Sequence, residues 1–153
     1  MKTEMTKGRG YTYLLPMRFI WTTRDCIPIL TDELAEEVRK YIGSTASRLS
    51  VDRWTAVVTP DTVQIDALCR PQITPADAVK VFKGNIARWL FMNHPEVREK
   101  VPDGHLWNTS YYVHSRDLWQ KEGSEGTPLP DEDELAYLED MRKKAGVIHG
   151  KEI

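Results

Sequence analysis

The chain has 153 residues, of which 41% are hydrophobic and 29% charged, and its formal net charge is −2. This length corresponds to about one domain, which can bury a core without a disulfide or a metal to hold it. No apolar run reaches the roughly 18 residues needed to cross a bilayer, and residues 1–5 lack the apolar core of a signal peptide. We therefore expect a cytoplasmic protein with no membrane partner, in which Cys26 and Cys69 are reduced and partly buried.

The acidic residues are concentrated in the last quarter of the chain. Residues 1–118 carry 16 Lys or Arg and 14 Asp or Glu, a net of +2, whereas residues 119–153 carry 5 and 9, a net of −4. The overall acidity argues against strong nucleic-acid binding. The uneven distribution still allows a modest basic face on the first 118 residues.

The first elements follow from composition and spacing. Residues 1–10 are polar and are predicted to form a disordered arm. Aromatic and β-favouring residues predict a first core strand over 17–22. Early acidic residues and apolar residues at helical spacing predict an amphipathic helix over 31–49. The apolar side of this helix consists of Leu34, Val38, Tyr41, Ile42 and Thr45.

A hairpin and a second helix are predicted next. Strands over 54–59 and 62–68 flank the tight turn Pro60-Asp61. Thr74 as N-cap, with Pro75 at the first helical position, predicts a helix over 75–93. The core side of this helix consists of Val79, Phe82, Ile86, Trp89 and Leu90.

The remaining elements complete an α+β pattern. An aromatic strand is predicted over 106–113 and ends a domain that spans 11–115; a Gly- and Pro-containing linker follows over 116–130. The last segment, 131–153, contains a helix over 131–144 whose acidic start and basic end suit the helix dipole. The order of elements predicts a ferredoxin-like antiparallel sheet with helices packed on one face.

Four segments of the chain, in order, resemble one family of proteins. They are FIWTTR at 19–24, VTPDTVQI at 58–65, TPAD at 74–77 with KGNIAR at 83–88, and LWNTSYYV at 106–113. Together they are similar to the single-tyrosine HUH transposases of bacterial insertion sequences, the IS-two-hundred type. The resemblance covers about residues 11–115 and implies the transposase fold of that family.

The resemblance also implies a catalytic site, from which this sequence departs. In the family, two histidines on one strand face bind Mg²⁺ or Mn²⁺, and a helix tyrosine attacks a DNA phosphate. Thr62 and Gln64 occupy the histidine positions here, and Met141 occupies the position of a further ligand. Tyr137 is the best match for the nucleophile, and its alternative role is that of a half-buried packing residue. Because hydroxyl, amide and thioether groups are poor ligands for these cations, we expect no metal and no other cofactor.

Other residues offer alternatives at the site. Asp61, Asp66, His105 and His114 are available for a relocated metal site, and Asp66 shares the strand face of Thr62 and Gln64. Each is more often a solvated or hydrogen-bonded side chain than a ligand. Whether the chain is an enzyme therefore stays open.

Three functions remain in view. The first is a transposase-like protein that binds single-stranded or hairpin DNA but has lost the metal site; the second is an active tyrosine transposase or nicking endonuclease with a rearranged site. The third is a non-catalytic dimeric scaffold. The residues considered for DNA contact are Arg24, Arg70, Lys80, Lys83 and Arg88 for phosphates, and Trp107 for stacking on bases. Solvated helix faces and core packing are the alternative roles of these residues, and the resemblance implies a homodimer.

Overall fold

The computed structural model describes residues 14–51, 53–101, 103–115 and 130–146. The predicted arm over 1–10 and nearly all of the predicted linker over 116–130 lie outside the described residues. Within them, no helix combines the length and the apolar character that a membrane crossing requires.

Four antiparallel strands form one sheet in the order β2-β3-β1-β4. The strands are β1 (Leu15–Thr22), β2 (Trp54–Thr59), β3 (Thr62–Cys69) and β4 (Tyr112–Ser115). Strands β2 and β3 form the predicted hairpin, and β1 lies between β3 and β4. The prediction of an antiparallel α+β fold is thus confirmed.

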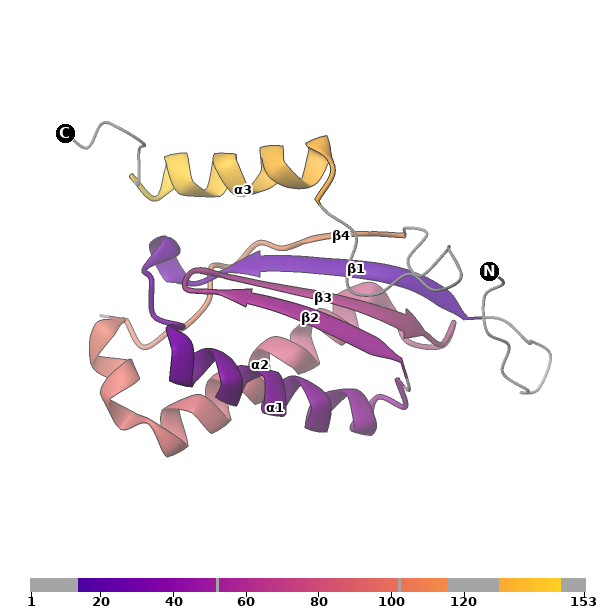
Figure 1. Ribbon diagram of the computed structural model, residues 1–153, viewed down its shortest axis with the longest axis horizontal. Coiled ribbons are helices and arrows are strands. Elements are labelled where there is room, and N and C mark those ends of the chain that lie inside the picture. Colours follow the sequence, from indigo (N-terminus) through magenta and orange to yellow (C-terminus); the bar gives the residue numbers. More distant parts are fainter. Residues whose placement is uncertain (1–13, 52, 102, 116–129, 147–153) are drawn as a thin grey trace.

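Helices α1 (Asp32–Arg48) and α2 (Pro75–Asn93) cover one face of the sheet, as predicted (Figure 1). At the start of α2, the Thr74 hydroxyl accepts a hydrogen bond from Asp77 N at 3.1 Å, so the predicted N-cap is confirmed. The predicted apolar side of α1 is buried, as are four of the five core residues predicted for α2. Trp89, the fifth, is half-buried at the edge, where its ring packs beside Tyr41.

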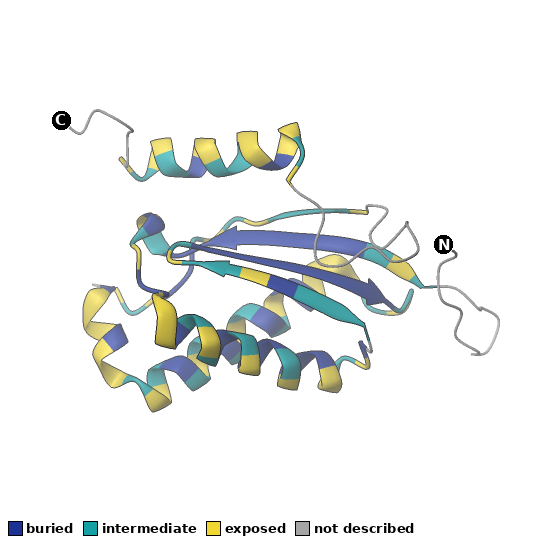
Figure 2. Cartoon of the chain, in the orientation of Figure 1, coloured by how far each residue is buried: buried dark blue, intermediate teal, exposed yellow. Residues whose placement is uncertain are grey.

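Helix α3 (Glu132–Lys144) lies on the opposite face of the sheet (Figure 1). The fold therefore has three layers, and the central strands are covered on both sides (Figure 2). Every residue of β3 is buried for this reason. Its odd-numbered residues, such as Val63 and Ile65, belong to the apolar core with α1 and α2. Because side chains alternate along a strand, the even-numbered residues must face α3.

The strand predicted over 106–113 is corrected by the structure. Trp107 forms only an isolated bridge with Thr23, and the regular strand β4 begins later, at Tyr112. Between them, the Lys83 ammonium binds the carbonyl oxygens of Asn108 at 2.7 Å and Ser110 at 3.5 Å. The Lys83 side chain thus binds carbonyl groups that could pair with a neighbouring strand if β4 began earlier in the chain.

Candidate functional site at the α3 face of the sheet

The two strand residues that stand where the resembled family has metal-binding histidines lie on the sheet face that α3 covers. Thr62 and Gln64 of β3 are buried and pair in register with Thr22 and Ile20 of β1. The next residue on the same face, Asp66, pairs with Arg18. The prediction that Thr62, Gln64 and Asp66 share one face is consistent with this register.

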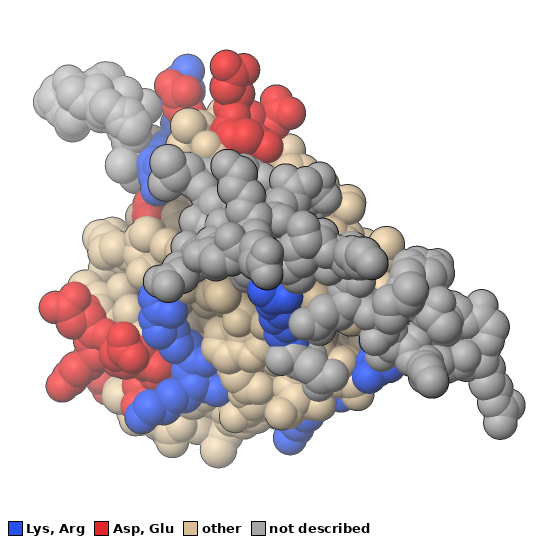
Figure 3. Space-filling view, turned by 45° about the vertical axis from the view of Figure 1, so that its right-hand side comes forward, with Lys and Arg blue, Asp and Glu red and all other residues tan. Residues whose placement is uncertain are grey.

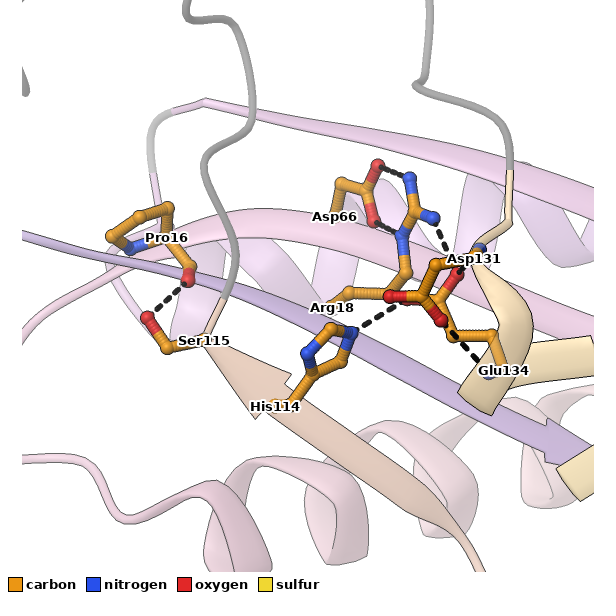
Figure 4. Close-up of polar contacts among 7 residues, drawn as sticks. All are labelled: Pro16, Arg18, Asp66, His114, Ser115, Asp131 and Glu134. Atoms are coloured by element: carbon orange, nitrogen blue, oxygen red, sulfur yellow. Dashed lines mark hydrogen bonds and ion pairs between the residues drawn. The ribbon is translucent and has the colours of Figure 1, made fainter.

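One end of this face holds a buried ion cluster, which we define as Arg18, Asp66, His114 and Glu134 (Figure 4). Arg18 Nε and Nη2 bind the two Asp66 carboxylate oxygens at 2.7 and 2.8 Å, and Arg18 Nη1 binds Glu134 Oε1 at 2.8 Å. His114 Nε2 lies 2.6 Å from Glu134 Oε2. The side chains of Arg18, Asp66 and Glu134 are only 0%, 1% and 0% exposed.

The buried ion cluster fixes where α3 begins. Asp131 and Glu134 form a capping box, in which each side chain accepts a hydrogen bond from the other residue's backbone N–H, at 2.9 and 3.1 Å. Burial alone raises the pKa of Glu134, but hydrogen bonds from His114 and Arg18 outweigh it and hold that pKa below its usual value. Glu134 therefore stays ionised while it both caps the helix and binds it to the sheet.

Sequence reasoning missed both Arg18 and Glu134. The Asp131-x-x-Glu134 spacing is a recognisable capping signal, so that part of the site was available from sequence. No local pattern indicates that Arg18 is buried, because its two carboxylate partners are 48 and 116 residues away.

The other end of α3 is held by a second ion pair. Arg142 Nε and Nη2 bind the two Asp61 carboxylate oxygens, each at 3.1 Å. Arg142 Nη2 also lies 3.5 Å from Thr62 Oγ1, which itself donates to Asp61 at 2.9 Å. Burial raises the pKa of Asp61, but the hydrogen bonds from Arg142 and Thr62 together lower it by more. The pKa of Asp61 is therefore below its usual value. The Arg142 guanidinium thus lies next to Thr62, the first of the two positions at which the resembled family has a histidine.

Tyr137 lies between these two ion pairs, on the side of α3 that faces the sheet. Its hydroxyl is 3.0 Å from Ser110 Oγ, and its ring packs against Tyr112 at 5.6 Å between centroids. Burial raises the pKa of Tyr137, and this effect is larger than the opposing effect of its hydrogen bond with Ser110. The phenol is therefore protonated at neutral pH, and its hydrogen-bond partner in the described part of the chain is a hydroxyl and not a base.

The donor set at the expected metal position does not fit a divalent cation. Mg²⁺ and Mn²⁺ are held mainly by carboxylate oxygens and water, whereas these three positions offer a threonine hydroxyl, one neutral amide carbonyl at Gln64 and, at Met141, a thioether. The Met141 sulfur accepts a hydrogen bond from Ser110 Oγ at 3.3 Å. A cation placed beside Thr62 would also be repelled by Arg142.

The alternative ligands do not supply a better site. Asp66 is bound to Arg18, Asp61 to Arg142, and His105 is exposed on a loop. His114, Asp131 and Glu134 have potential ligand atoms within 4.8 Å of one another. A cation at that point would lie beside the Arg18 guanidinium, which binds Glu134 Oε1 at 2.8 Å and would repel it.

Most of the basic residues considered for DNA contact have partners within the protein. Arg24 pairs with Asp103 at 2.7 Å, and Arg70 donates to the Ser50 carbonyl at 3.2 Å. Arg88 lies beside the Trp89 ring, and burial lowers the pKa of Lys83, which is bound to the Asn108 carbonyl. Lys80 is exposed on α2.

Of the two roles considered for Trp107, base stacking and core packing, the structure supports core packing. Its side chain is only 7% exposed, its indole N–H donates to the Lys83 carbonyl at 2.9 Å, and its ring meets Trp21 edge-on. An indole with its ring in the core and its N–H bonded inside the fold has no free face for a nucleobase.

Comparison with known proteins identifies the class. The family model described as "Transposase IS200 like" matches residues 11–122. The chain is 36% identical over 110 residues to the ISDra2 transposase TnpA of Deinococcus radiodurans, an alignment that covers 72% of this chain and 79% of that protein. A candidate transposase of D. radiodurans R1 known from a crystal structure superposes with a TM-score of 0.71 at 28% identity, over 92% of this chain and 98% of that one. This protein belongs to the IS200-like transposase family.

Proposed function

We propose that this protein is a DNA-binding member of its family that holds single-stranded or hairpin DNA. We propose further that it has lost metal-dependent cleavage of that DNA. The observation that carries the proposal is the α3 face of the sheet. The family's fold is retained there, but Thr62, Gln64 and Met141 stand at the expected ligand positions and Arg142 places a cation beside them.

Binding of DNA and cleavage of DNA require different parts of the molecule. Recognition needs a shaped surface with cations for phosphates, and the fold can keep this surface when the metal site is lost. Cleavage needs an activated nucleophile and stabilisation of charge at the scissile phosphate. The raised pKa of Tyr137 and the donor set around Thr62 disfavour cleavage of DNA. Neither feature affects the surface that recognition of DNA would require.

A binding assay tests this proposal directly. Fluorescence anisotropy would compare a hairpin, a single strand and a duplex of equal length, each with and without Mn²⁺. We expect the hairpin or the single strand to bind more tightly than the duplex, with a Kd that Mn²⁺ does not change. Affinity that requires Mn²⁺ would contradict the loss of the metal site. Failure to bind any probe would contradict the DNA-binding role and favour the scaffold.

A tyrosine DNA strand transferase is the second candidate function, and the position of Tyr137 on the sheet-facing side of α3 favours it. In such a reaction the Tyr137 phenol would lose its proton to solvent and its oxygen would bond to phosphorus, while the 3′-oxygen of the broken strand would leave and take up a proton. A suicide oligonucleotide that traps this adduct separates the two candidates. We expect no adduct; one that forms on the wild type and is absent from Tyr137→Phe would establish the enzyme.

We also propose that two copies associate along a sheet edge. Strand β4 pairs with β1 on one side, and within the described part of the chain its other side has no strand partner. An edge strand presents N–H and C=O groups that can pair with a second sheet. Light scattering should give twice the chain mass of 17.7 kDa, whereas a monomer at micromolar concentrations would rule this association out.

A further inference from the structure

The structure contains a groove away from the α3 face, between α2 and the segment 104–111. Two adjoining cavities of about 300 and 310 Å³ form it, and both are lined by Lys83 and Thr109. One continues past Gly84 and Ala87 to Phe91, and the other past Val79 to Lys80 and Tyr111. We propose that this groove, which we call the α2 groove, binds a single-stranded oligonucleotide; the inference rests on the proposed DNA-binding function.

Positive charge is distributed along the α2 groove. Lys80 is exposed at one end, and Lys83 crosses the middle. At the other end the Arg98 guanidinium stacks on Phe91 at 4.7 Å, and its Nη1 atom lies 3.3 Å from where a Cβ on Gly104 would be. Lys80 is the exposed cation of the lining, Lys83 is bound to the Asn108 carbonyl, and Arg98 lies next to the lining residue Phe91. Their positive charge favours an anionic ligand.

The acidic residues near the α2 groove are few. Neither cavity is lined by an Asp or a Glu among the described residues. Asp103 adjoins the lining but is paired with Arg24, and Asp77 lies one turn before Lys80 on the surface of α2. In the face shown in Figure 3, acidic side chains gather at the top and again at the lower left, and most of the Lys and Arg side chains lie in the lower half. The charge of the groove therefore complements phosphate.

The shape and the apolar walls of the groove favour an unpaired strand over a duplex. Each cavity has the volume of the smallest ligand pockets, about 300 Å³, which suits a single base. Val79, Ala87 and Phe91 supply apolar walls, and Tyr111 is 37% exposed at one end, where it can stack on a base. A duplex keeps its bases inside and would present only phosphates to these walls.

The length of the groove sets the size of the bound segment. From Lys80 to Phe91, α2 rises by about 16 Å at ~1.5 Å per residue. That distance accommodates about five nucleotides at a rise of ~3.4 Å each, and fewer if the strand is extended.

The groove also connects to the α3 face. Thr109 and Tyr111 line it, while Ser110 between them contacts the Tyr137 hydroxyl at 3.0 Å. Alternate side chains of one short segment thus serve the two sites. A strand that lies in the α2 groove and passes over Tyr111 is directed toward Tyr137.

Salt-dependent binding separates phosphate contacts from base contacts. The probe is a fluorescein-labelled 15-residue oligothymidylate, measured with the full chain by anisotropy at several salt concentrations. Lys80→Gln should weaken binding and reduce the slope of log affinity against log salt by about 0.7, the effect of one phosphate contact on a single strand. Tyr111→Ala should weaken binding about tenfold with no change in slope, because stacking releases no counterions. Lys40→Gln changes an exposed side chain of α1 and is the matched control. It should change neither the affinity nor the slope.

The outcomes distinguish the groove from the function on which it rests. If the wild type binds the probe and both groove variants bind it equally well, the α2 groove is wrong and DNA binding stands. If the wild type binds no nucleic acid, the proposed function fails and the groove fails with it. Displacement of the probe by polyglutamate as readily as by unlabelled oligothymidylate would overturn base recognition and indicate an acidic peptide.

Photocrosslinking gives an independent check. An oligothymidylate with 5-iododeoxyuridine at single positions should form an adduct on the peptide that contains Tyr111 upon irradiation. Adducts confined to peptides of α1 or α3 would overturn the assignment.

Discussion

The buried ion cluster gives the sharpest test of how α3 is held to the sheet. Changing Arg18 to Met keeps much of the side-chain volume but leaves Asp66 and Glu134, which are 1% and 0% exposed, without their guanidinium. Removing one partner of a buried ion pair costs about 3–5 kcal/mol. The total stability of a domain is only about 5–15 kcal/mol, so Arg18→Met should remove a large part of it.

Two variants separate charge compensation from packing. Arg24→Met removes an Arg from a partly exposed ion pair, and its unfolding curve should overlay that of the wild type. Combining Arg18→Met with Asp66→Leu and Glu134→Met replaces the three fully buried members of the cluster, and it should recover most of the loss because apolar side chains of similar volume need no partner.

Urea unfolding followed by circular dichroism measures the free energies, and hydrogen exchange of α3 peptides shows whether the helix detaches first. We expect α3 exchange to rise in Arg18→Met at urea concentrations where the sheet is still protected. A loss in Arg18→Met no larger than that in Arg24→Met, or a triple variant less stable than Arg18→Met, would refute the reasoning.

Three further predictions concern the same sites. Thr62→His with Gln64→His should bind Mn²⁺ only weakly by calorimetry and more tightly when Arg142→Ala is added, because the guanidinium no longer repels the cation; equal affinity with and without Arg142 would contradict this. The pKa of Glu134 is below its unfolded value, so its contribution to stability is present above the unfolded pKa of about 4.3 and is lost as the pH falls through the folded pKa. Urea unfolding as a function of pH should therefore show a smaller acid-side loss for Glu134→Gln than for the wild type, and parallel curves would exclude the linkage. Trp107→Ala should lower the free energy of unfolding by about 3–5 kcal/mol, the cost of a core Trp; a selective loss of DNA affinity at unchanged stability would restore the stacking role.

The contrast between Trp107 and Tyr111 shows what local sequence leaves undecided. Both are aromatic residues in one short segment, and alternation alone puts them on the same side of an extended chain. Both line the α2 side of the segment, but the Trp107 indole donates to the Lys83 carbonyl and its ring packs on Trp21, so Trp107 is buried while Tyr111 stays 37% exposed. The difference arises from α2, a distant element.

The sequence alone determined the elements whose signals are local. The Pro60-Asp61 turn, the Thr74 cap and the apolar faces of α1 and α2 each depend on residues within a few positions of one another. The order of these elements determined the fold class, and the identities at Thr62 and Gln64 raised the question of the metal site.

Only the tertiary structure decided which face α3 covers and which charges are buried. Arg18 reads locally as one polar residue in an apolar strand, yet the register of β1 with β3 sets it opposite Asp66, and α3 brings Glu134 from 116 positions away. The same packing placed Arg142 beside Thr62 and Tyr137 beside Ser110. Such pairings depend on strand register and helix docking, and these are fixed by the packing of the whole chain.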